Sequence, residues 1–449
     1  MFRKVMCGVV AAACLTVPAL ANQGTSKLRV PVTEFDLPNG LHVILHEDHT
    51  IPTVSTNIWY HVGSGRESAG HSGFAHLFEH LMFCGSGHVA KGQFDELLEK
   101  VGGTNNASTS EDRTNYYTTV PANALPLVLF LESDRMGYLI QNLRGDLVDE
   151  QRDVVRNEYR QRYLNTPYGK SYLAMPSYMY PEGHPYSWPV IGHEEELMKF
   201  NNTDVINFFR KYYVPNNASL AICGDFKTDE VRKMVEYWFS DIPRGEDLKP
   251  LNVAPVQLDS VVKKEIIDKV ELPSRTICWH TPKEFTPDDI ALDIAGLILA
   301  DGKESRLQKR MIVKEQLAQL VNATQMSQSL GSIFSIDFMP RPGHTLDELQ
   351  SVVDEELRKL AQDPPSEEEM AVAVNGLKAA FYRTIEKNAN VANYLNRYYL
   401  TVGKADYFEE NLEEYMAVTP ERVSEVVRRY LVPDKRLELT TIPEQTAKK

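Results

Sequence analysis

Cysteine is scarce in this sequence, with 5 among 449 residues. Cys7 and Cys14 lie in an apolar N-terminal stretch, and the other three, Cys84, Cys223 and Cys278, are far apart. Such an odd, scattered set does not form a disulfide framework, and the lack of any CxxC pair excludes a zinc site built on that motif. We expect these three cysteines to be buried small hydrophobic residues.

Positive charge and long apolar runs are also in short supply. The chain has 48 Lys and Arg against 62 Asp and Glu, for a formal net charge of -14. Nucleic-acid binding needs a concentrated basic patch, so we expect no nucleic-acid partner. Beyond the N-terminus no segment is apolar enough to span a bilayer, so we expect no membrane span in the mature chain.

The N-terminus has the pattern of a secretory signal peptide at residues 1–21. Arg3 and Lys4 form a short positive region, residues 5–20 are apolar, and Ala19 and Ala21 fit a small-residue cleavage site. A lipoprotein signal ending at Cys14 is the weaker alternative, because the residues before it make a poor lipobox. We therefore expect a chain secreted across the inner membrane and located in a periplasm.

The remaining pattern predicts an α+β protein with more than one domain, because 449 residues exceed one ordinary core. Alternating apolar residues predict strands over 30–36, 41–47 and 53–62, and helical periodicity begins near Ser72. Later segments mix helical patterns with short β-rich runs such as 114–120. This order argues against a doubly wound sheet.

A weak internal repeat supports two similar domains. Residues 209–215 (FRKYYVP) resemble residues 427–433 (VRRYLVP) at an offset of 218, and each segment follows a predicted helix and precedes a predicted strand. The alternative is a chance likeness between two helix ends. We expect a signal peptide at 1–21, an N-terminal domain at 22–245, a linker at 246–262 and a C-terminal domain at 263–449.

The segment 73–83 (GFAHLFEHLMF) carries the chemistry. On a helix, His76 and His80 are four residues apart and face the same side, so both imidazoles can reach one metal ion. Glu79 lies on that side without being forced into direct coordination. Imidazole suits zinc, and catalytic zinc keeps three protein ligands and an open position. A surface helix with incidental His and Glu is the alternative, but the surrounding apolar residues fit a solvated face poorly.

A third ligand is expected from the helical segment 149–159, which offers Glu150, Asp153 and Glu158. Spacing alone leaves these three alternatives open.

Several motifs resemble the pitrilysin (M16) metallopeptidases, whose inverted H-x-x-E-H order differs from the H-E-x-x-H of thermolysin-like enzymes. The resemblance covers essentially the whole chain after the signal segment. It rests on residues 63–67 (GSGRE), 73–83, 102–107 (GGTNNA), the helix bearing Glu158, 184–186 (HPY), 191–192 (IG) and 305–307 (SRL).

This resemblance implies a zinc metalloendopeptidase, a hydrolase of peptide bonds, with one zinc ion per chain. It assigns His76, His80 and Glu158 as metal ligands and Glu79 as general base. It also implies two similar domains, each a mostly antiparallel sheet covered by helices. The length matches the half-size (M16B-like) members, such as the β-type catalytic chain of the mitochondrial processing peptidase and its bacterial relatives. The rival interpretation is a non-catalytic scaffold or assembly subunit of the same fold.

Two departures from the family pattern stand out. Gln151 occupies the position, seven residues before the glutamate ligand, where the family often has an acidic residue, with Glu150 beside it. Gln151 can hydrogen-bond a group around the metal but carries no charge. In the second half, Ile312 and Gln319 stand where active assemblies supply an Arg and a Tyr. We therefore expect a heterodimer whose related partner supplies the Arg and Tyr.

The alternative is a homodimer in which Arg306, Arg310 or a loop tyrosine of this chain takes that role.

The expected substrates are peptides or unfolded segments cleaved inside a closed chamber. Asn105, Asn106 and Ala107 begin a predicted strand that could present a free edge beside the metal, on which an extended peptide adds as a further strand. The alternative is that Asn105, Asn106 and Thr109 are only turn and strand-end residues.

Overall fold

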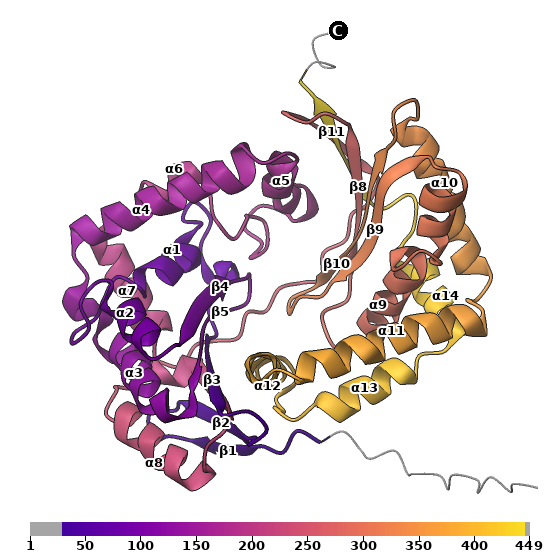
Figure 1. The fold of residues 1–449 in the computed structure, drawn as a ribbon. Coiled ribbons are helices and arrows are strands. Elements are labelled where there is room, and N and C mark those ends of the chain that lie inside the picture. The colour runs from indigo at the N-terminus through magenta and orange to yellow at the C-terminus, as the bar shows by residue number, and fades with distance from the viewer. Residues whose placement is uncertain (1–28, 445–449) are drawn as a thin grey trace, which may run out of the picture.

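A computed structural model of the chain describes residues 29–444 and contains two sheets, each with its own helices (Figure 1). We call the part up to α8 the N half and the part from β7 onward the C half. The expected signal peptide lies outside the described residues.

The N-half sheet has six strands in the order β1-β2-β6-β3-β5-β4. Only the pair β2–β6 is parallel. Strand β4 forms one edge of this sheet, as the predicted free strand requires. The strands are β1 (Thr33–Asp36), β2 (His42–Glu47), β3 (Thr53–Tyr60), β4 (Thr104–Thr109), β5 (Thr114–Pro121) and β6 (Ala218–Gly224).

The C-half sheet repeats this arrangement in the order β7-β11-β8-β10-β9, with β7–β11 as its only parallel pair. Strands β6 and β11, which follow the two similar segments of the sequence, take equivalent places beside a parallel neighbour. The predicted fold class of two mostly antiparallel sheets covered by helices is therefore confirmed. The strands are β7 (Val262–Asp268), β8 (Ser274–Thr281), β9 (Ala318–Met326), β10 (Ser332–Pro340) and β11 (Leu437–Pro443).

Helices cover the sheets. In the N half they are α1 (Phe74–Leu81), α2 (Gln93–Lys100), α3 (Leu125–Asn142), α4 (Gly145–Tyr159), α5 (Gly169–Met179), α6 (Glu194–Leu197), α7 (Asn202–Tyr212) and α8 (Thr228–Phe239). In the C half they are α9 (Pro287–Ala300), α10 (Leu346–Gln362), α11 (Glu367–Ile385), α12 (Asn388–Val402), α13 (Phe408–Met416) and α14 (Pro420–Tyr430).

The N-half sheet is buried on both faces, and a C-half helix covers one of them. Along β6, Leu220 and Ile222 point into the core beneath the N-half helices, whereas Ala221 and Cys223 point to the opposite face. Alternation along a strand produces this division. The second face packs against α12 of the C half, which lies beside β3 in Figure 1.

The C-half sheet is covered in the reciprocal way. Cys278 and Leu439 point away from their own helices and pack with Met179, the last residue of α5, and the following Tyr180. Helix α5 belongs to the N half and lies beside β11 in the ribbon (Figure 1). Each half therefore provides a cover for the other half's sheet. Cys84, Cys223 and Cys278 are buried and free, as predicted.

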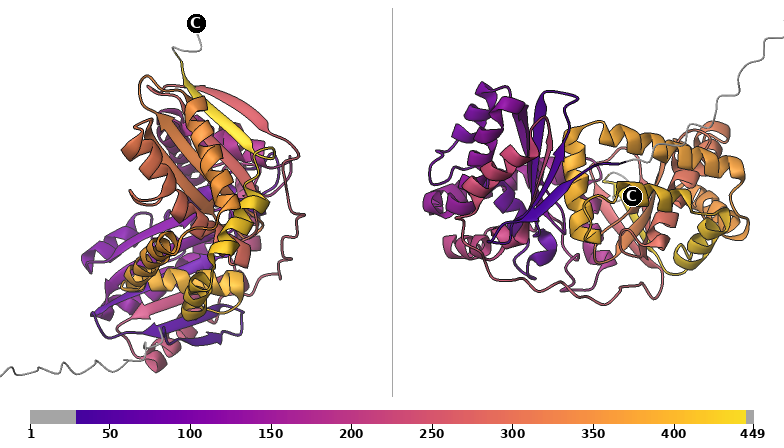
Figure 2. Two further views of the ribbon diagram at one scale, coloured as in Figure 1. Left: turned by 90° about the vertical axis from the view of Figure 1, so that its right-hand side faces the viewer. Right: turned by 90° about the horizontal axis from the view of Figure 1, so that it is seen from below.

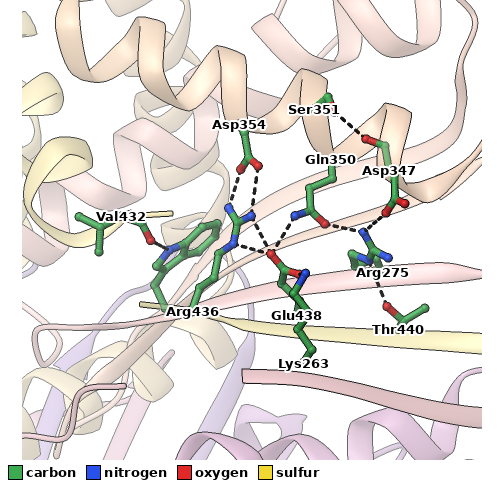
Figure 3. Close-up of polar contacts among 11 residues, drawn as sticks. Lys263, Arg275, Asp347, Gln350, Ser351, Asp354, Val432, Arg436, Glu438 and Thr440 are labelled. Atoms are coloured by element: carbon green, nitrogen blue, oxygen red, sulfur yellow. Dashed lines mark hydrogen bonds and ion pairs between the residues drawn. The ribbon is translucent and has the colours of Figure 1, made fainter. Parts of the chain in front are cut away.

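A buried polar network ties α10 to the C-half sheet (Figure 3). Arg436 pairs with Asp354 of α10 and with Glu438 of β11, and its guanidinium lies over the ring of Trp279. Glu438 also accepts a hydrogen bond of 2.8 Å from Gln350. Because both charges of the Arg436–Glu438 pair are almost fully buried, removing either would leave Arg436 with Asp354 alone or Glu438 with only Gln350 and Lys263 as partners.

Residues 243–261 connect the two halves without any helix or strand and run along one side of the molecule (Figure 2). The expected linker, 246–262, falls in this segment except for Val262, the first residue of β7. Between residues 29 and 444, no helix combines the length and apolar character needed to cross a bilayer.

Candidate active site

Helix α1 begins at Phe74, and two carboxylates accept hydrogen bonds at its start. Glu67 accepts from the backbone N–H groups of Gly73 (2.9 Å) and Ala75 (2.7 Å). Glu196 accepts from both the N–H and the hydroxyl of Ser72, each at 2.7 Å. These acceptors satisfy donors that a helix N-terminus otherwise leaves unpaired.

Glycine is required where α1 begins. Gly73 has a φ of +94°, and a Cβ on Gly192 would lie 2.5 Å from the Cα of Gly73. The two chain segments therefore touch backbone to backbone, which explains why the sequence carries glycine at both positions. Leu77, Phe78 and Leu81 anchor the buried side of α1, so His76, Glu79 and His80 are presented on its other side.

His76 and His80 converge on Glu158 of α4. The Nε2 atom of His76 lies 3.7 Å from one carboxylate oxygen of Glu158, and Nε2 of His80 lies 3.2 Å from the other. Ligand atoms of the three residues all lie within 4.8 Å of one another, and in the described part of the chain no other His, Cys, Asp and Glu form such a group. Two imidazoles and a carboxylate are a donor set that catalytic zinc uses. The residues present therefore fit the ion.

The other two candidates for a third ligand lie elsewhere. Glu150 is exposed and pairs with Lys91 at 2.5 Å. Asp153 is exposed and pairs with Arg156 at 3.1 Å. Gln151 is half-buried on α4 and is not among the residues lining the cleft around the histidines.

The protonation states favour metal binding. Burial lowers the pKa of His76 to about 4, against the opposing effect of the Glu158 carboxylate, so its imidazole is neutral at neutral pH. Burial alone would raise the pKa of Glu158, but the hydrogen bond from His80, the electrostatic effect of His76 when it is protonated and the charge of Arg162 outweigh burial and lower that pKa. A neutral imidazole and an ionised carboxylate are the forms that ligate a metal.

Glu79 is held beside the metal group by the edge strand. The hydroxyl of Thr109, the last residue of β4, donates a hydrogen bond of 2.6 Å to the Glu79 carboxylate. Burial raises the pKa of Glu79, although the Thr109 hydrogen bond and the nearby His80 oppose this. A carboxylate with a raised pKa is a better proton acceptor near neutral pH than an ordinary one.

These groups face a cleft of about 710 Å³. One wall is the edge strand β4 with the start of its turn, including Asn106 and Ala107. The other walls carry Arg162, Tyr163 and Tyr172. Tyr172 is 57% exposed, and its ring stacks on that of Tyr163 with 5.6 Å between centroids.

The sequence reasoning missed three of these residues and misjudged one. Arg162 pairs with Glu158 at 2.9 Å, four residues along the same helical path, so i,i+4 spacing was an available signal. Tyr163 and Tyr172 gave no such signal. The sequence placed Thr109 on or at the end of the predicted edge strand and gave no sign of its hydrogen bond to Glu79. Asn105 points away from the cleft, because its amide donates to Asp95 at 2.8 Å.

The arginines considered for the homodimer alternative are engaged within the C half. Arg306 pairs with Glu369 at 2.7 Å. Arg310 pairs with three carboxylates, those of Glu315, Glu355 and Glu356, at 2.8–2.9 Å. Ile312 lies in the π-helical segment Gln308–Lys314, and Gln319 lies on the edge strand β9.

Family models match both halves of the chain. Residues 42–167 match the insulinase family (peptidase family M16), and residues 199–377 match the peptidase M16 inactive domain. The chain therefore belongs to the M16 peptidase family, as its motifs predicted.

Its relatives include the zinc protease PqqE of Helicobacter pylori, 29% identical over 84% of this chain and 83% of that protein. The probable mitochondrial-processing peptidase subunit beta of Arabidopsis thaliana is 24% identical over 90% of this chain and 77% of its own. The crystal structure of a protease from Helicobacter pylori is similar with a TM-score of 0.87 and 26% identity, covering 93% of this chain and all of that one.

A pH effect on stability follows from the carboxylate that caps α1. Burial raises the pKa of Glu67 to about 8, although its two backbone hydrogen bonds favour the charged form. Between pH 4.5 and 8 the folded chain therefore keeps a proton that the unfolded chain has lost, so this contribution to stability is present at low pH and disappears as the pH rises to 8.

We expect the Glu67→Gln variant to lack this trend. Relative to the variant, metal-free wild-type chain should lose about 2–4 kcal/mol of unfolding free energy between pH 5 and 8, less than the full pKa shift implies because Glu67 is partly exposed. Urea unfolding across this pH range measures the difference. If the unfolding free energies of the two chains changed with pH in parallel, the pKa of Glu67 would not be raised in the folded chain, and the prediction would be wrong.

Proposed function

We propose that this chain is a zinc-dependent endopeptidase, with His76, His80 and Glu158 as zinc ligands and Glu79 as general base. The supporting observation is the convergence of two imidazoles and the Glu158 carboxylate beside a second carboxylate, that of Glu79, in an open cleft. Membership in a peptidase family, with relatives named zinc proteases, agrees with this chemistry.

Each side chain then has a defined task. A bound zinc ion would supply Lewis acidity, which polarises a carbonyl and acidifies water. Glu79 accepts the proton of the attacking water and passes it to the leaving amine, and the Thr109 hydroxyl holds the Glu79 carboxylate in place for both transfers. Arg162 holds one oxygen of Glu158 at 2.9 Å and so fixes the direction in which that carboxylate points.

The proposed substrate is an extended peptide or unfolded segment. Strand β4 is an edge of the sheet with no strand on its outer side, and Asn106 to Thr109 line the cleft next to Glu79. A peptide that adds to this edge as another strand gains main-chain hydrogen bonds with little dependence on its sequence. Pairing also brings its backbone alongside the base and the metal ligands.

The proposed assembly is a heterodimer in which a related chain completes the site. Ile312 and Gln319 cannot supply a cation or a phenol, and Arg306 and Arg310 are held by carboxylates of their own half. A relative of this chain is itself named as a subunit.

A non-catalytic scaffold is the second candidate, because the C half matches a domain described as inactive.

The zinc site is tested by metal content and turnover of an internally quenched peptide. We expect one zinc per wild-type chain and zinc retained in Glu79→Gln, with turnover reduced by about a hundredfold or more. His80→Ala should lose both zinc and turnover, because it removes a ligand. A wild-type chain that purifies without stoichiometric zinc and does not bind it when offered would favour the scaffold.

The need for a partner is tested by assaying the zinc-loaded chain alone. Since an oxyanion donor is worth about a hundredfold or more in rate, we expect turnover of the isolated chain to fall at least that far below turnover with the related subunit that copurifies with it. Robust hydrolysis by the isolated chain would contradict the heterodimer. If Arg310→Ala then abolished it without unfolding the chain, the homodimer would replace it.

Secretion to a periplasm is proposed from the N-terminal segment. We expect the chain recovered from the periplasmic fraction to begin at Asn22, following cleavage after Ala21. Intact-mass measurement of that fraction checks this, and a full-length chain recovered only from the cytoplasm would contradict it.

A further inference from the structure

The turn between β4 and β5, residues 110–113, lies at the end of the edge strand that lines the cleft. Its N-half side is held by the backbone of the 63–65 segment: Ser64 N–H donates to Ser110 O at 3.1 Å, and Gly65 N–H donates to Glu111 O at 2.8 Å. A Cβ on Gly63 would meet Ser110 O at 2.2 Å, so this approach requires glycine. The turn is therefore packed closely against the 63–65 segment of the N half.

The other side of the same turn is held by the C half. Asp112 accepts a hydrogen bond of 3.1 Å from the backbone N–H of Ser329, in the turn between β9 and β10. Its second oxygen accepts a short hydrogen bond from the Tyr186 hydroxyl, and that hydroxyl in turn accepts from Leu330 N–H at 3.1 Å. Asp112 and Tyr186 thus join the two turns through three hydrogen bonds.

The C-half side of this junction is itself fixed. The Ser329 hydroxyl donates to Glu284 at 2.9 Å, and Glu284 pairs with Arg397 of α12 at 3.0 Å. Helix α12 is the helix that covers the N-half sheet. The turn that reaches Asp112 is therefore braced against the same helix that holds the two halves together.

A second contact from α12 reaches the edge strand itself. The side-chain oxygen of Asn393 accepts from Trp59 of β3 at 3.3 Å and from Asn115 of β5 at 3.4 Å. Asn115 accepts from the hydroxyl of Ser108 on β4 at 2.7 Å. Two chains of contacts therefore run from the C half to the last residues of β4.

We propose that Asp112 is a positioning residue through which the C half sets the edge strand β4 where a substrate peptide pairs with it. Asp112 is three residues from Thr109, whose hydroxyl holds the Glu79 carboxylate at 2.6 Å. The C half thus orients, within the same chain, the strand edge on which a substrate peptide pairs. This inference rests on the proposed peptidase function.

Substitution of Asp112 by Asn keeps the volume of the side chain but replaces an acceptor oxygen with an NH₂ group. Because Ser329 N–H and the Tyr186 hydroxyl both donate to Asp112, the NH₂ group either faces the Ser329 N–H or makes the Tyr186 hydroxyl turn and accept, so an original hydrogen bond is lost in both cases. Tyr186→Phe removes the hydroxyl that links Asp112 to Leu330 and leaves the ring in place. The two variants therefore weaken the same junction from opposite sides.

The experiment compares a long internally quenched peptide with a shortened one that ends beside the scissile bond and cannot pair along β4. It uses the zinc-loaded chain in the assembly that supports turnover. For Asp112→Asn and Tyr186→Phe we expect KM for the long peptide to rise about tenfold with kcat nearly unchanged, because strand pairing stabilises ground state and transition state alike. Zinc content and kinetics on the short peptide should stay at the wild-type level.

A binding measurement separates positioning from catalysis. In the Glu79→Gln background, the Kd of the long peptide should rise by the same factor when Asp112→Asn is added. Asp337→Asn is the matched control: Asp337 accepts from the Thr276 hydroxyl at 2.6 Å inside the C half, away from the cleft. It should leave KM and Kd unchanged.

The outcomes distinguish this inference from the proposed function. Wild-type turnover with unchanged KM and Kd in both variants would overturn the positioning role alone. An equal loss on long and short peptides, or loss of zinc, would also overturn it, because the effect would then be a general disturbance of the fold. A wild-type assembly that neither cleaves nor binds peptide would refute the peptidase proposal and this inference with it.

Discussion

The structure depends on one packing constraint: each sheet has two apolar faces, and its own half covers only one of them. Small side chains on β6, Ala221 and Cys223, let α12 of the C half approach the N-half sheet. In the same way, Cys278 and Leu439 of the C-half sheet pack against the end of α5 and the residues that follow it in the N half. Burying these faces supplies the free energy that holds the halves in a fixed relation. The two halves are therefore one structural unit despite their similar folds.

The packing of α5 on the C-half sheet also affects the active site, because α5 follows α4, the helix that carries Glu158. Helix α4 presents Glu158 to the histidines of α1, the π-helical turn Arg160–Leu164 presents Arg162, and α5 then docks on the C-half sheet. The histidine ligands and the glutamate ligand are thus held in place by different parts of the structure. The histidines are fixed by the N-half core around Leu77 and Phe78, whereas the segment after Glu158 is fixed by the C half.

The sequence was sufficient for features that local periodicity encodes. The spacing of His76, Glu79 and His80 placed all three on one side of a helix, and the similar segments 209–215 and 427–433 indicated two related sheets. It was insufficient for contacts between distant segments. The capping of α1 by Glu67, the hydrogen bond from Thr109 to Glu79 and the contact of Asp112 with Ser329 join residues separated by 6 to 217 positions. No periodic pattern encodes such pairs, because they depend on loop paths set by the tertiary fold. Glu158 could be chosen over Glu150 and Asp153 only through the family resemblance.

The two halves divide the work of the proposed enzyme unequally. Every residue of the metal group and its base comes from the N half, while the C-half positions that would supply a cation and a phenol hold Ile312 and Gln319. Arg306 and Arg310, the arginines of this segment, are held by glutamates, and moving either one into the site would break its ion pairs within the C half. A contribution of the C half to transition-state charge is therefore disfavoured by its own ion pairs. The contribution left to the C half is geometric: α12 and the β9–β10 turn fix the edge strand β4, on which the proposed substrate peptide pairs. The C half therefore supplies no group to the proposed metal site, but the proposed reaction still depends on the strand position that the C half sets.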